Sequence, residues 1–506
     1  MADETSPTTE NQPPKSLWAF AKSGVIWALI QSWGSRLLTF VISIILARLL
    51  SPTEFGIAQA SALLLGFVPL VAEFGFGAAI IQRKDLKPYE VNLPFFSTVV
   101  IGLLLLLCVV LFSDQIQAFA GGTGEEEGDL SIYITVAAGT VLLTLPTLFQ
   151  EAFYKKHMRF KSLALRQMAC NLVGGAAAVG TAFAGFGLWS FMIQIYIASI
   201  ISAVWLWSRP QWLPSTRLDT PSFLRMSRFG LPIVGQRFND FLGTRLIEFL
   251  IISQIGLAAY GLYAVGSRLY LLMLELLQRA LYDVSLSVLS HISYDRERVG
   301  SVYLKTITLS SHVMAPIFVL VAALSPEIML FLFGNKWMGV EIIATPLLLL
   351  GSLQCVQHMN GAFLTARGKP SLVLITGITK TVMTVVGLLL IPAKTVENMT
   401  IVFVLTQALA APLSFVIVWR ELRISGTALT WTLVQATLLC GACFMLVEFL
   451  RPVVATHVSI NIIQGIVLGA AFLLCYIVLL VIFDRPKAQM AKDLVAGKLR
   501  KRKAVA

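Results

Sequence analysis

Residues 230–253 read GLPIVGQRFNDFLGTRLIEFLIIS, and residues 257–283 read LAAYGLYAVGSRLYLLMLELLQRALYD. Each segment is long enough for a membrane-spanning helix, which needs about 20 predominantly apolar residues. Before the terminal Asp283, seven charged side chains nevertheless interrupt the two segments: Arg237, Asp240, Arg245, Glu248, Arg268, Glu275 and Arg279. Charge inside a bilayer is costly and is found where it faces the protein interior or a water-filled cavity. These two segments therefore decide how the rest of the chain is organised.

The spacing of these charges places them on one face of each helix. At about 100° per residue, the four charges of the first segment fall within roughly 140°. The three charges of the second segment are spaced i, i+7 and i+11, which confines them to an arc of roughly 40°. Two charged faces are thus turned away from lipid. They face either a water-filled cavity or each other, and the sequence leaves both alternatives open.

The whole chain has the composition of a protein that crosses the membrane many times. Of its 506 residues, 57% are hydrophobic and 13% are charged, and the mean hydropathy is +0.79. Apolar blocks recur from Ser23 to residue 483 and predict fourteen transmembrane helices. A lipid-exposed backbone must bond within its own segment, and no stretch alternates with the period of a barrel strand. We therefore predict an all-α polytopic membrane protein.

The distribution of lysine and arginine predicts the orientation of these helices. With both termini in the cytoplasm, the outer loops hold only Lys336, Lys394 and Arg451, and most of the 39 basic residues fall in inner segments. A miscounted helix would destroy this alternation. Because the net charge of +12 follows this bias, it indicates no nucleic-acid partner. The N-terminal residues lack the basic start of a cleavable signal, so we expect the first hydrophobic helix to be retained.

The fourteen helices are expected to form two lobes of six, followed by two extra helices. The segment around Phe55 and Gly56 aligns with the segment around Tyr260 and Gly261 at a shift of 205 residues, which suggests two repeats of parallel topology. Two-lobed transporters built from such repeats hold substrate between the lobes. The predicted parts are a polar cytoplasmic segment (1–22), the N-lobe (23–207), a cytoplasmic linker (208–228), the C-lobe (229–420), the last two helices (421–483) and a basic cytoplasmic tail (484–506).

Five segments carry a resemblance to a known family: SRLLTFVISIILARLLSPTEFGIAQ (35–59), AEFGFGAAIIQRKDL (72–86), RALYDVSLSVLS (279–290), LFLFGNKW (330–337) and TARGKP (365–370). In these segments the chain resembles the Wzx-type flippases of bacterial polysaccharide biosynthesis, which belong to the multidrug/oligosaccharidyl-lipid/polysaccharide exporter (MOP) superfamily. The likeness covers most of the chain from Ser23 to about Arg420 and is nearest to the exopolysaccharide and colanic-acid exporter branch. The family has no strict catalytic signature, so the candidate site residues rest on the chemistry of this sequence.

The resemblance implies a transporter and not an enzyme. Such a flippase would move undecaprenyl-diphosphate-linked oligosaccharide repeat units from the cytoplasmic to the periplasmic leaflet of the bacterial inner membrane, for exopolysaccharide, capsule or lipopolysaccharide biosynthesis. It also implies a V-shaped pair of lobes, as in MATE and MurJ transporters, that alternates between inward-open and outward-open states. Coupling to a H⁺ or Na⁺ gradient is expected, with no other cofactor. Membrane lipids and the polymerase and chain-length or export proteins of the same pathway are the expected partners.

A cationic cavity between the lobes would suit this cargo, because guanidinium groups match phosphate oxygens in geometry. The candidate cavity cations are Arg36, Arg237, Arg245, Arg268 and Lys380, with Arg279 near the cytoplasmic mouth. The simpler alternative is that these cations pair with neighbouring carboxylates, Arg237 with Asp240 and an arginine of the second segment with Glu275. Several of these groups can do both, so neither interpretation is excluded at this point.

Two further sets of polar side chains inside the predicted spans are candidates for a role. Coupling needs a group whose proton or cation occupancy changes between states, and the candidate carboxylates are Glu73, Asp240, Glu248 and Glu275. Sugar hydroxyls need neutral hydrogen-bonding partners, and the candidates within GSLQCVQHMNGAF (351–363) are Gln354, Gln357 and His358. Hydrogen bonding between helices is the alternative role for every one of these residues.

Two other classes of function are alternatives to the flippase. A MATE-like multidrug or cation antiporter would favour an acidic, aromatic cavity, which the excess of arginine opposes. A membrane polymerase or ligase of lipid-linked glycans would carry reactive groups in a large outer loop, whereas SDQIQAFAGGTGEEEGD (113–129) is short and glycine-rich. No paired catalytic carboxylates, activated nucleophile or metal-ligand spacing occurs in an aqueous segment, so we expect neither catalytic residues nor a metal site.

Overall fold

The structure is a computed structural model of the chain, and it describes residues 33–483 apart from 121–129, 293–295, 392 and 459. Within these ranges the regular secondary structure consists of helices only. Each predicted span falls, over its described residues, on one helix or on consecutive helical segments. The prediction of an all-α membrane protein is confirmed. The predicted cytoplasmic tail, the polar N-terminal segment and residues 23–32 of the first predicted helix lie outside the described residues.

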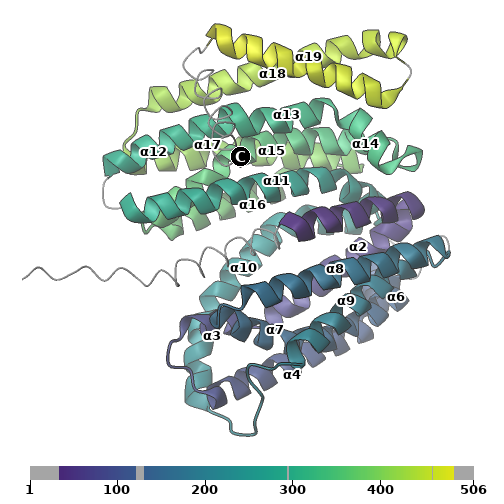
Figure 1. Ribbon diagram of the computed structural model, residues 1–506, viewed down its shortest axis with the longest axis vertical. Helices are drawn as coiled ribbons and strands as arrows, with labels where there is room; N and C mark the ends of the chain where they lie inside the picture. Colours follow the sequence, from purple (N-terminus) through teal and green to yellow (C-terminus); the bar gives the residue numbers. More distant parts are fainter. Residues whose placement is uncertain (1–32, 121–129, 293–295, 392, 459, 484–506) are drawn as a thin grey trace, which may run out of the picture.

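The N-terminal lobe forms the lower half of the molecule in Figure 1. It consists of a helix over residues 33–49, drawn in purple, and of α2 (Pro52–Ala72), α3 (Phe76–Gln82), η1 (Pro88–Val91), α4 (Asn92–Leu111), α5 (Ser113–Phe119), α6 (Leu130–Ala138), α7 (Thr140–Lys156), α8 (Phe160–Phe183) and α9 (Trp189–Trp207). A capping box starts α2: the Glu54 amide donates to the Ser51 hydroxyl, and the Ser51 amide donates to the Glu54 carboxylate. Pro52 in the first turn fits the same start, because its missing N–H would have no helical partner there.

The C-terminal lobe lies above it, with a last pair of helices at the top of Figure 1. The lobe consists of α10 (Thr220–Gln254), α11 (Leu257–Ile292), α12 (Arg296–Leu309), η2 (Ser310–Met314), α13 (Ala315–Ala323), α14 (Ser325–Phe333), η3 (Asn335–Trp337), α15 (Val340–Ala366), α16 (Pro370–Leu390) and α17 (Val396–Leu422). The pair α18 (Gly426–His457) and α19 (Asn461–Phe483) packs against α13 and α14.

One helix joins the two lobes directly. Helix α10 begins at Thr220, inside the segment predicted as a linker, because Pro221 fits its first turn, and it continues through Pro232 to Gln254. Its first half packs on α3 and α4 of the N-lobe, and its second half packs on α11 and α16 of the C-lobe. The predicted first and second charged helices therefore correspond to α10 and α11, which are longer than the predicted spans.

The lobes meet where α2 crosses α11, toward the right-hand end of Figure 1, and they diverge toward the other end. Two glycines allow the backbones to touch at this crossing. A Cβ atom on Gly56 would lie 2.0 Å from the Leu257 carbonyl oxygen, and one on Gly261 would lie 2.0 Å from that of Pro52. The shift of 205 residues that relates the sequence segments also relates Gly56 to Gly261 and Pro52 to Leu257, so each repeat makes the same contact with the other. The two repeats thus meet each other across a local two-fold axis.

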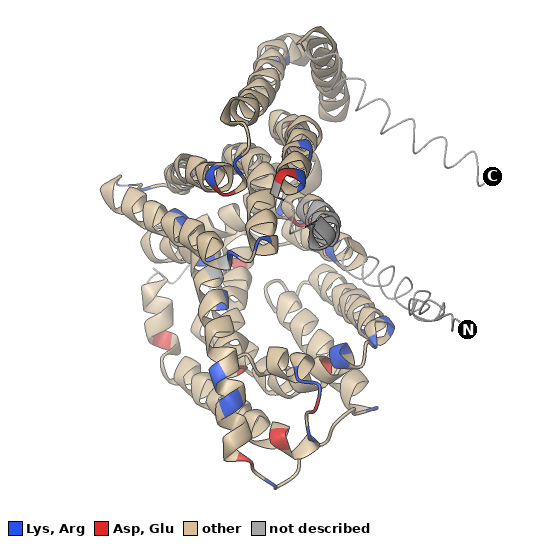
Figure 2. Cartoon of the chain, turned by 90° about the vertical axis from the view of Figure 1, so that its left-hand side faces the viewer, with Lys and Arg blue, Asp and Glu red and all other residues tan. Residues whose placement is uncertain are grey.

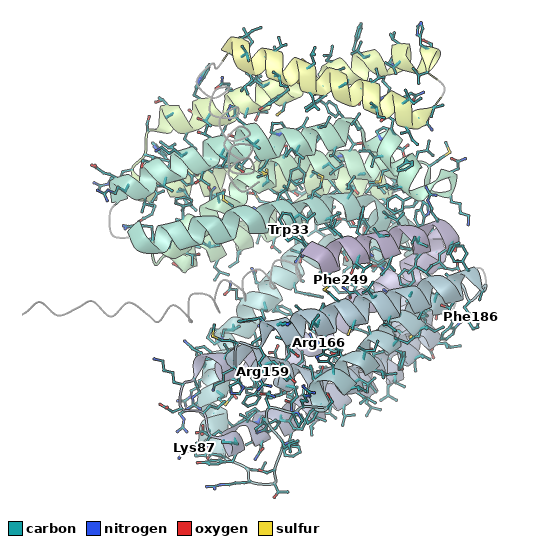
Figure 3. All side chains as sticks on the ribbon, in the orientation of Figure 1. Trp33, Lys87, Arg159, Arg166, Phe186 and Phe249 are labelled. Carbon is teal, nitrogen blue, oxygen red and sulfur yellow. The ribbon has the colours of Figure 1, made fainter. Side chains whose placement is uncertain are left out.

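The ends of the helices agree with the alternation of inner and outer segments. Lys87 and Arg159, from two predicted inner segments, lie toward the left-hand end of the N-lobe, and Phe186, from a predicted outer turn, lies at the right-hand end (Figure 3). Figure 2 looks onto the left-hand end and shows lysine and arginine on helix ends of both lobes. The lobe contact through α2 and α11 therefore lies at the end that the charge pattern assigns to the outside.

Candidate substrate cavity

A cavity of about 760 Å³ lies between the two lobes, and we call it the interlobe cavity. Its walls come from the helix over 33–49, α2 and α8 on one side and from α10 and α11 on the other. The lining side chains with charged or hydrogen-bonding groups are Ser35, Arg36, Thr39, Ser43, Gln59, Gln167, Asn171, Arg245, Tyr260, Arg268 and Glu275. Arg245 from the predicted charged face of α10, and Arg268 and Glu275 from that of α11, are thus turned toward a polar cavity.

The polarity of this cavity explains why two helices lack the hydropathy of a membrane span. Eleven helices of the described residues are long and apolar enough to cross a membrane. Of the other three predicted spans, α8 and α10 fall short in hydropathy, and the first is described only over residues 33–49. All three contribute polar side chains to the interlobe cavity, for example Arg36, Asn171 and Arg245. Facing water inside the protein lets these helices carry groups that lipid would not tolerate.

Three arginines bring positive charge into the interlobe cavity. Arg36 comes from the N-lobe, and Arg245 and Arg268 come from α10 and α11. The Arg268 guanidinium donates to the Gln59 side-chain oxygen at 2.7 Å and lies 5.8 Å from the centre of the Phe55 ring. Its buried Nε has no hydrogen-bond partner, and no described carboxylate lies within ion-pair distance of it. Arg268 therefore contributes a positive charge that the described protein groups do not neutralise.

The other two cavity arginines form ion pairs. Arg36 pairs with Glu275, so this bridge joins the N-lobe to α11 of the C-lobe. Arg245 donates to Glu248 at 2.6 Å within α10, and the Tyr260 hydroxyl donates to the same carboxylate at 2.8 Å. Cavity lining and internal pairing, the two alternatives left open by the sequence, occur together at these residues. With Arg268 included, the described charges of this cluster sum to a positive value.

Arg237, the remaining predicted cation of α10, lies apart from this cluster. Its guanidinium donates to Glu73, which follows the last residue of α2, at 2.9 Å. Neither Arg237 nor Glu73 lines the interlobe cavity in this conformation. Arg237 and Glu275 thus each form a pair across the lobes, with Glu73 and Arg36. The side chains of Asp240 and Arg279 lie outside the described residues.

A second cavity of about 560 Å³ lies within the C-lobe, among α10, α11, α15, α16 and α17, and we call it the C-lobe pocket. It holds the other predicted candidates, namely Lys380, Gln354, Gln357 and His358. Leu271 and Glu275 line both cavities, so the two spaces adjoin. Sequence reasoning placed Lys380 with the arginines, whereas the structure places it in this second space.

The amides of α15 are largely engaged in bonds between helices. The Tyr270 hydroxyl donates to the Gln354 side-chain oxygen at 2.6 Å, and the Gln357 amide donates to the Ser414 hydroxyl at 3.0 Å. His358 Nδ1 lies 3.2 Å from the Gln354 carbonyl oxygen one turn earlier. The first two bonds give Gln354 and Gln357 the interhelical role that was the alternative to sugar contact, whereas the His358 contact lies within α15. They also hold the wall of the C-lobe pocket in place.

Sequence reasoning missed several residues of the interlobe cavity. Ser35, Thr39 and Ser43 lie beside Arg36 on one face of the first helix at a spacing of four residues, which is a signal that could have identified the lining face. Gln59 and Gln167 carry no such signal, because one amide in an apolar helix is equally typical of a contact between helices. Only the fold shows that they face the cavity.

The chain is similar to proteins of polysaccharide biosynthesis. Residues 45–341 match the family model described as "Polysaccharide biosynthesis protein". The succinoglycan biosynthesis transport protein ExoT of Rhizobium meliloti (strain 1021) is 23% identical over 62% of this chain and 62% of its own length. The teichuronic acid biosynthesis protein TuaB of Bacillus subtilis (strain 168) is 22% identical over 69% of this chain and 72% of its own length. The alignment thus spans about three fifths of ExoT.

The fold is similar to that of a solved transporter. The lipid II flippase MurJ in an inward closed conformation superposes with a TM-score of 0.72 at 12% sequence identity, covering 91% of this chain and 99% of the other. At this identity the likeness concerns the fold alone. It confirms the predicted likeness of the fold to that of MurJ.

Proposed function

This chain belongs to the polysaccharide biosynthesis protein family, and from that premise we propose that it is a flippase for a polyprenyl-diphosphate-linked oligosaccharide. The resemblance to Wzx-type flippases is confirmed by the family match and by the relatives that share it. The chain is a membrane transporter and not an enzyme. Its placement in the bacterial inner membrane, its undecaprenyl-linked cargo and the pathway's polymerase as a partner are parts of the proposal.

The observation that carries this proposal is the positively charged cavity between the lobes. A diphosphate and its sugars cannot cross hydrocarbon unaided, whereas a polyprenyl tail can remain in lipid. Guanidinium groups of Arg36, Arg245 and Arg268 would replace the water lost by the diphosphate, because charge-assisted bonds to phosphate oxygens are strong. An antiporter of cationic drugs would need the opposite charge in the same place. The cavity therefore favours an anionic headgroup.

The headgroup would pass from one leaflet to the other as the lobes separate at one side of the membrane and come together at the other. The Arg36–Glu275 bridge joins the lobes and therefore has to break when they move apart. We propose that a H⁺ or Na⁺ at Glu275 weakens this bridge and couples movement to an ion gradient. Glu275 lies on both cavities and is 53% exposed, which supports access of an ion from water.

The test is the substitution Arg268→Gln, which removes the uncompensated charge while keeping a polar side chain. We expect polymer export by cells to fall by at least about tenfold, because a charge-assisted bond to phosphate is worth more than one factor of ten in affinity. Arg209→Gln, which changes an exposed arginine remote from the interlobe cavity, is the matched control and should leave export unchanged.

Protein levels in the membrane must be equal among the three forms. Normal export by Arg268→Gln at normal protein level would refute the binding role of the interlobe cavity. If purified wild-type protein also fails to move a polyprenyl-diphosphate saccharide between the leaflets of liposomes, the proposed function itself is wrong.

A further inference from the structure

The C-lobe pocket contains a lysine without an acidic partner. The Lys380 ammonium donates to the Gln357 side-chain oxygen at 2.7 Å. Among the described residues no carboxylate lies within ion-pair distance of it, and Gln357 is its one hydrogen-bond partner. An ammonium has three N–H donors, so donors remain available to an occupant of the pocket. A positive charge with spare donors, set in the middle of a membrane helix, points to an anionic partner.

The acidic groups near this lysine are already engaged elsewhere. Glu248 and Glu275 line the C-lobe pocket from α10 and α11. Glu248 accepts from Arg245 and from Tyr260, and Glu275 pairs with Arg36 on the far side of the interlobe cavity. The groups contributed by α15 and α17 are neutral amides and hydroxyls together with His358, whose Nδ1 lies against a backbone carbonyl. The described pocket therefore keeps one uncompensated positive charge at Lys380.

The shape of the two cavities places this charge beyond the arginine cluster. Because Leu271 and Glu275 line both spaces, a molecule held by Arg268 could extend past them toward Lys380. The volume of about 560 Å³ lies in the range of pockets that enclose small organic ligands. Its walls carry amide and hydroxyl groups such as Gln407 and Thr376, which suit sugar hydroxyls. The expected occupant thus combines hydroxyl groups with one negative charge.

The type of cation distinguishes the C-lobe pocket from a site that binds a diphosphate. Guanidinium forks, which bind phosphate oxygens two at a time, are gathered in the interlobe cavity. A single ammonium is a point charge and suits a single carboxylate among neutral neighbours. We propose that the C-lobe pocket is a subsite for an acidic sugar of the cargo, with Lys380 binding the carboxylate of that sugar. This inference rests on the proposed function and adds a substrate class to it.

The experiment compares two synthetic polyprenyl-diphosphate disaccharides that differ only in the second sugar, which is glucuronic acid in one and glucose in the other. Binding to purified wild-type protein in lipid nanodiscs is measured for both. We expect the acidic compound to bind about tenfold more tightly, as a charge-assisted hydrogen bond would give. Lys380→Gln should remove this preference by weakening the acidic compound alone, and Lys380→Arg should retain it.

Lys369→Gln is the matched control, because Lys369 lies beside the start of the same helix, outside the pocket, and pairs with Glu421 at 2.6 Å. It should keep the wild-type preference. Equal binding of the two compounds by wild-type protein would refute the acidic-sugar subsite while leaving the proposed function standing. A preference that survives in Lys380→Gln, or that disappears in both glutamine variants, would also refute the role of Lys380. If wild-type protein binds neither compound, the proposed function fails together with this inference.

Discussion

At the scale of single residues, the charges inside the membrane form partnerships that sequence spacing did not reveal. Helical periodicity predicted that Arg245 and Glu248 share one face, and they form a pair within α10. It could not predict that Arg36 meets Glu275 or that Arg237 meets Glu73, because these partners are far apart in sequence. Such contacts depend on how the lobes pack. Periodicity within one helix contains no information about the helix opposite.

The Arg36–Glu275 bridge should matter more for transport than for stability. Because Glu275 is 53% exposed, we expect Glu275→Gln to change the free energy of unfolding by less than about 1 kcal/mol. Each single charge reversal, Arg36→Glu or Glu275→Arg, should reduce export, because two like charges then face each other across the lobes. The double reversal should restore part of the export, since the bridge forms again with its ends exchanged.

This prediction is checked by a double-mutant cycle on export rate together with thermal denaturation of the purified variants. If the double reversal loses as much export as the two single reversals added together, the two charges do not act as a pair.

At the scale of elements, the contact of α2 with α11 holds the lobes together at one end. It depends on Gly56 and Gly261, because any side chain there would collide with a backbone carbonyl. Trp337 and Arg48 add bonds between the lobes at the same end. The Trp337 indole donates to the Ala47 carbonyl at 2.7 Å, and Arg48 donates to the Leu332 carbonyl at 2.7 Å. The sequence repeat predicted that these two glycines correspond, but not that they touch.

Adding one methyl group at the crossing should weaken this contact. We expect Gly56→Ala or Gly261→Ala to destabilise the protein by about 1–3 kcal/mol, because the backbones must separate to accept the Cβ atom. Gly66→Ala on the same helix is the control, since its Cβ would meet nothing within 4 Å. Alanine is also the better helix former, so this control should be neutral or stabilising. Thermal denaturation in detergent measures the three variants. Equal loss of stability at all three positions would contradict the close contact.

At the scale of the whole molecule, the least apolar helices gather around one cavity and the most apolar ones face lipid. Helices α16 and α19 are largely exposed within the described protein, as expected for a lipid-facing surface. The helix over 33–49, α8 and α10 turn their polar residues inward. The two lobes enclose a charged space that each lobe alone would leave open. The molecule therefore has a polar, charged interior within a shell of apolar helices.

Coupling to an ion gradient is tested on the whole molecule in proteoliposomes. We expect an imposed pH or Na⁺ gradient to accelerate flipping of a polyprenyl-diphosphate saccharide several-fold, because ion binding at Glu275 would weaken the bridge between the lobes. Glu275→Gln should show the same rate with and without the gradient. Each variant is compared with its own rate in the absence of a gradient. Flipping by wild-type protein that is indifferent to pH, Na⁺ and membrane potential would exclude coupling.

The sequence by itself determined the class of the protein, its membrane-spanning segments and the faces on which its charges lie. These follow from local physics, because hydropathy, helical period and the cost of charge in lipid act along one segment. Only the tertiary structure decided that Arg268 keeps its charge in the interlobe cavity while Lys380 lies in a separate pocket. It also decided that Glu275 bridges to Arg36. The physical reason is that partners are chosen by contacts between helices distant in sequence, which no local pattern encodes.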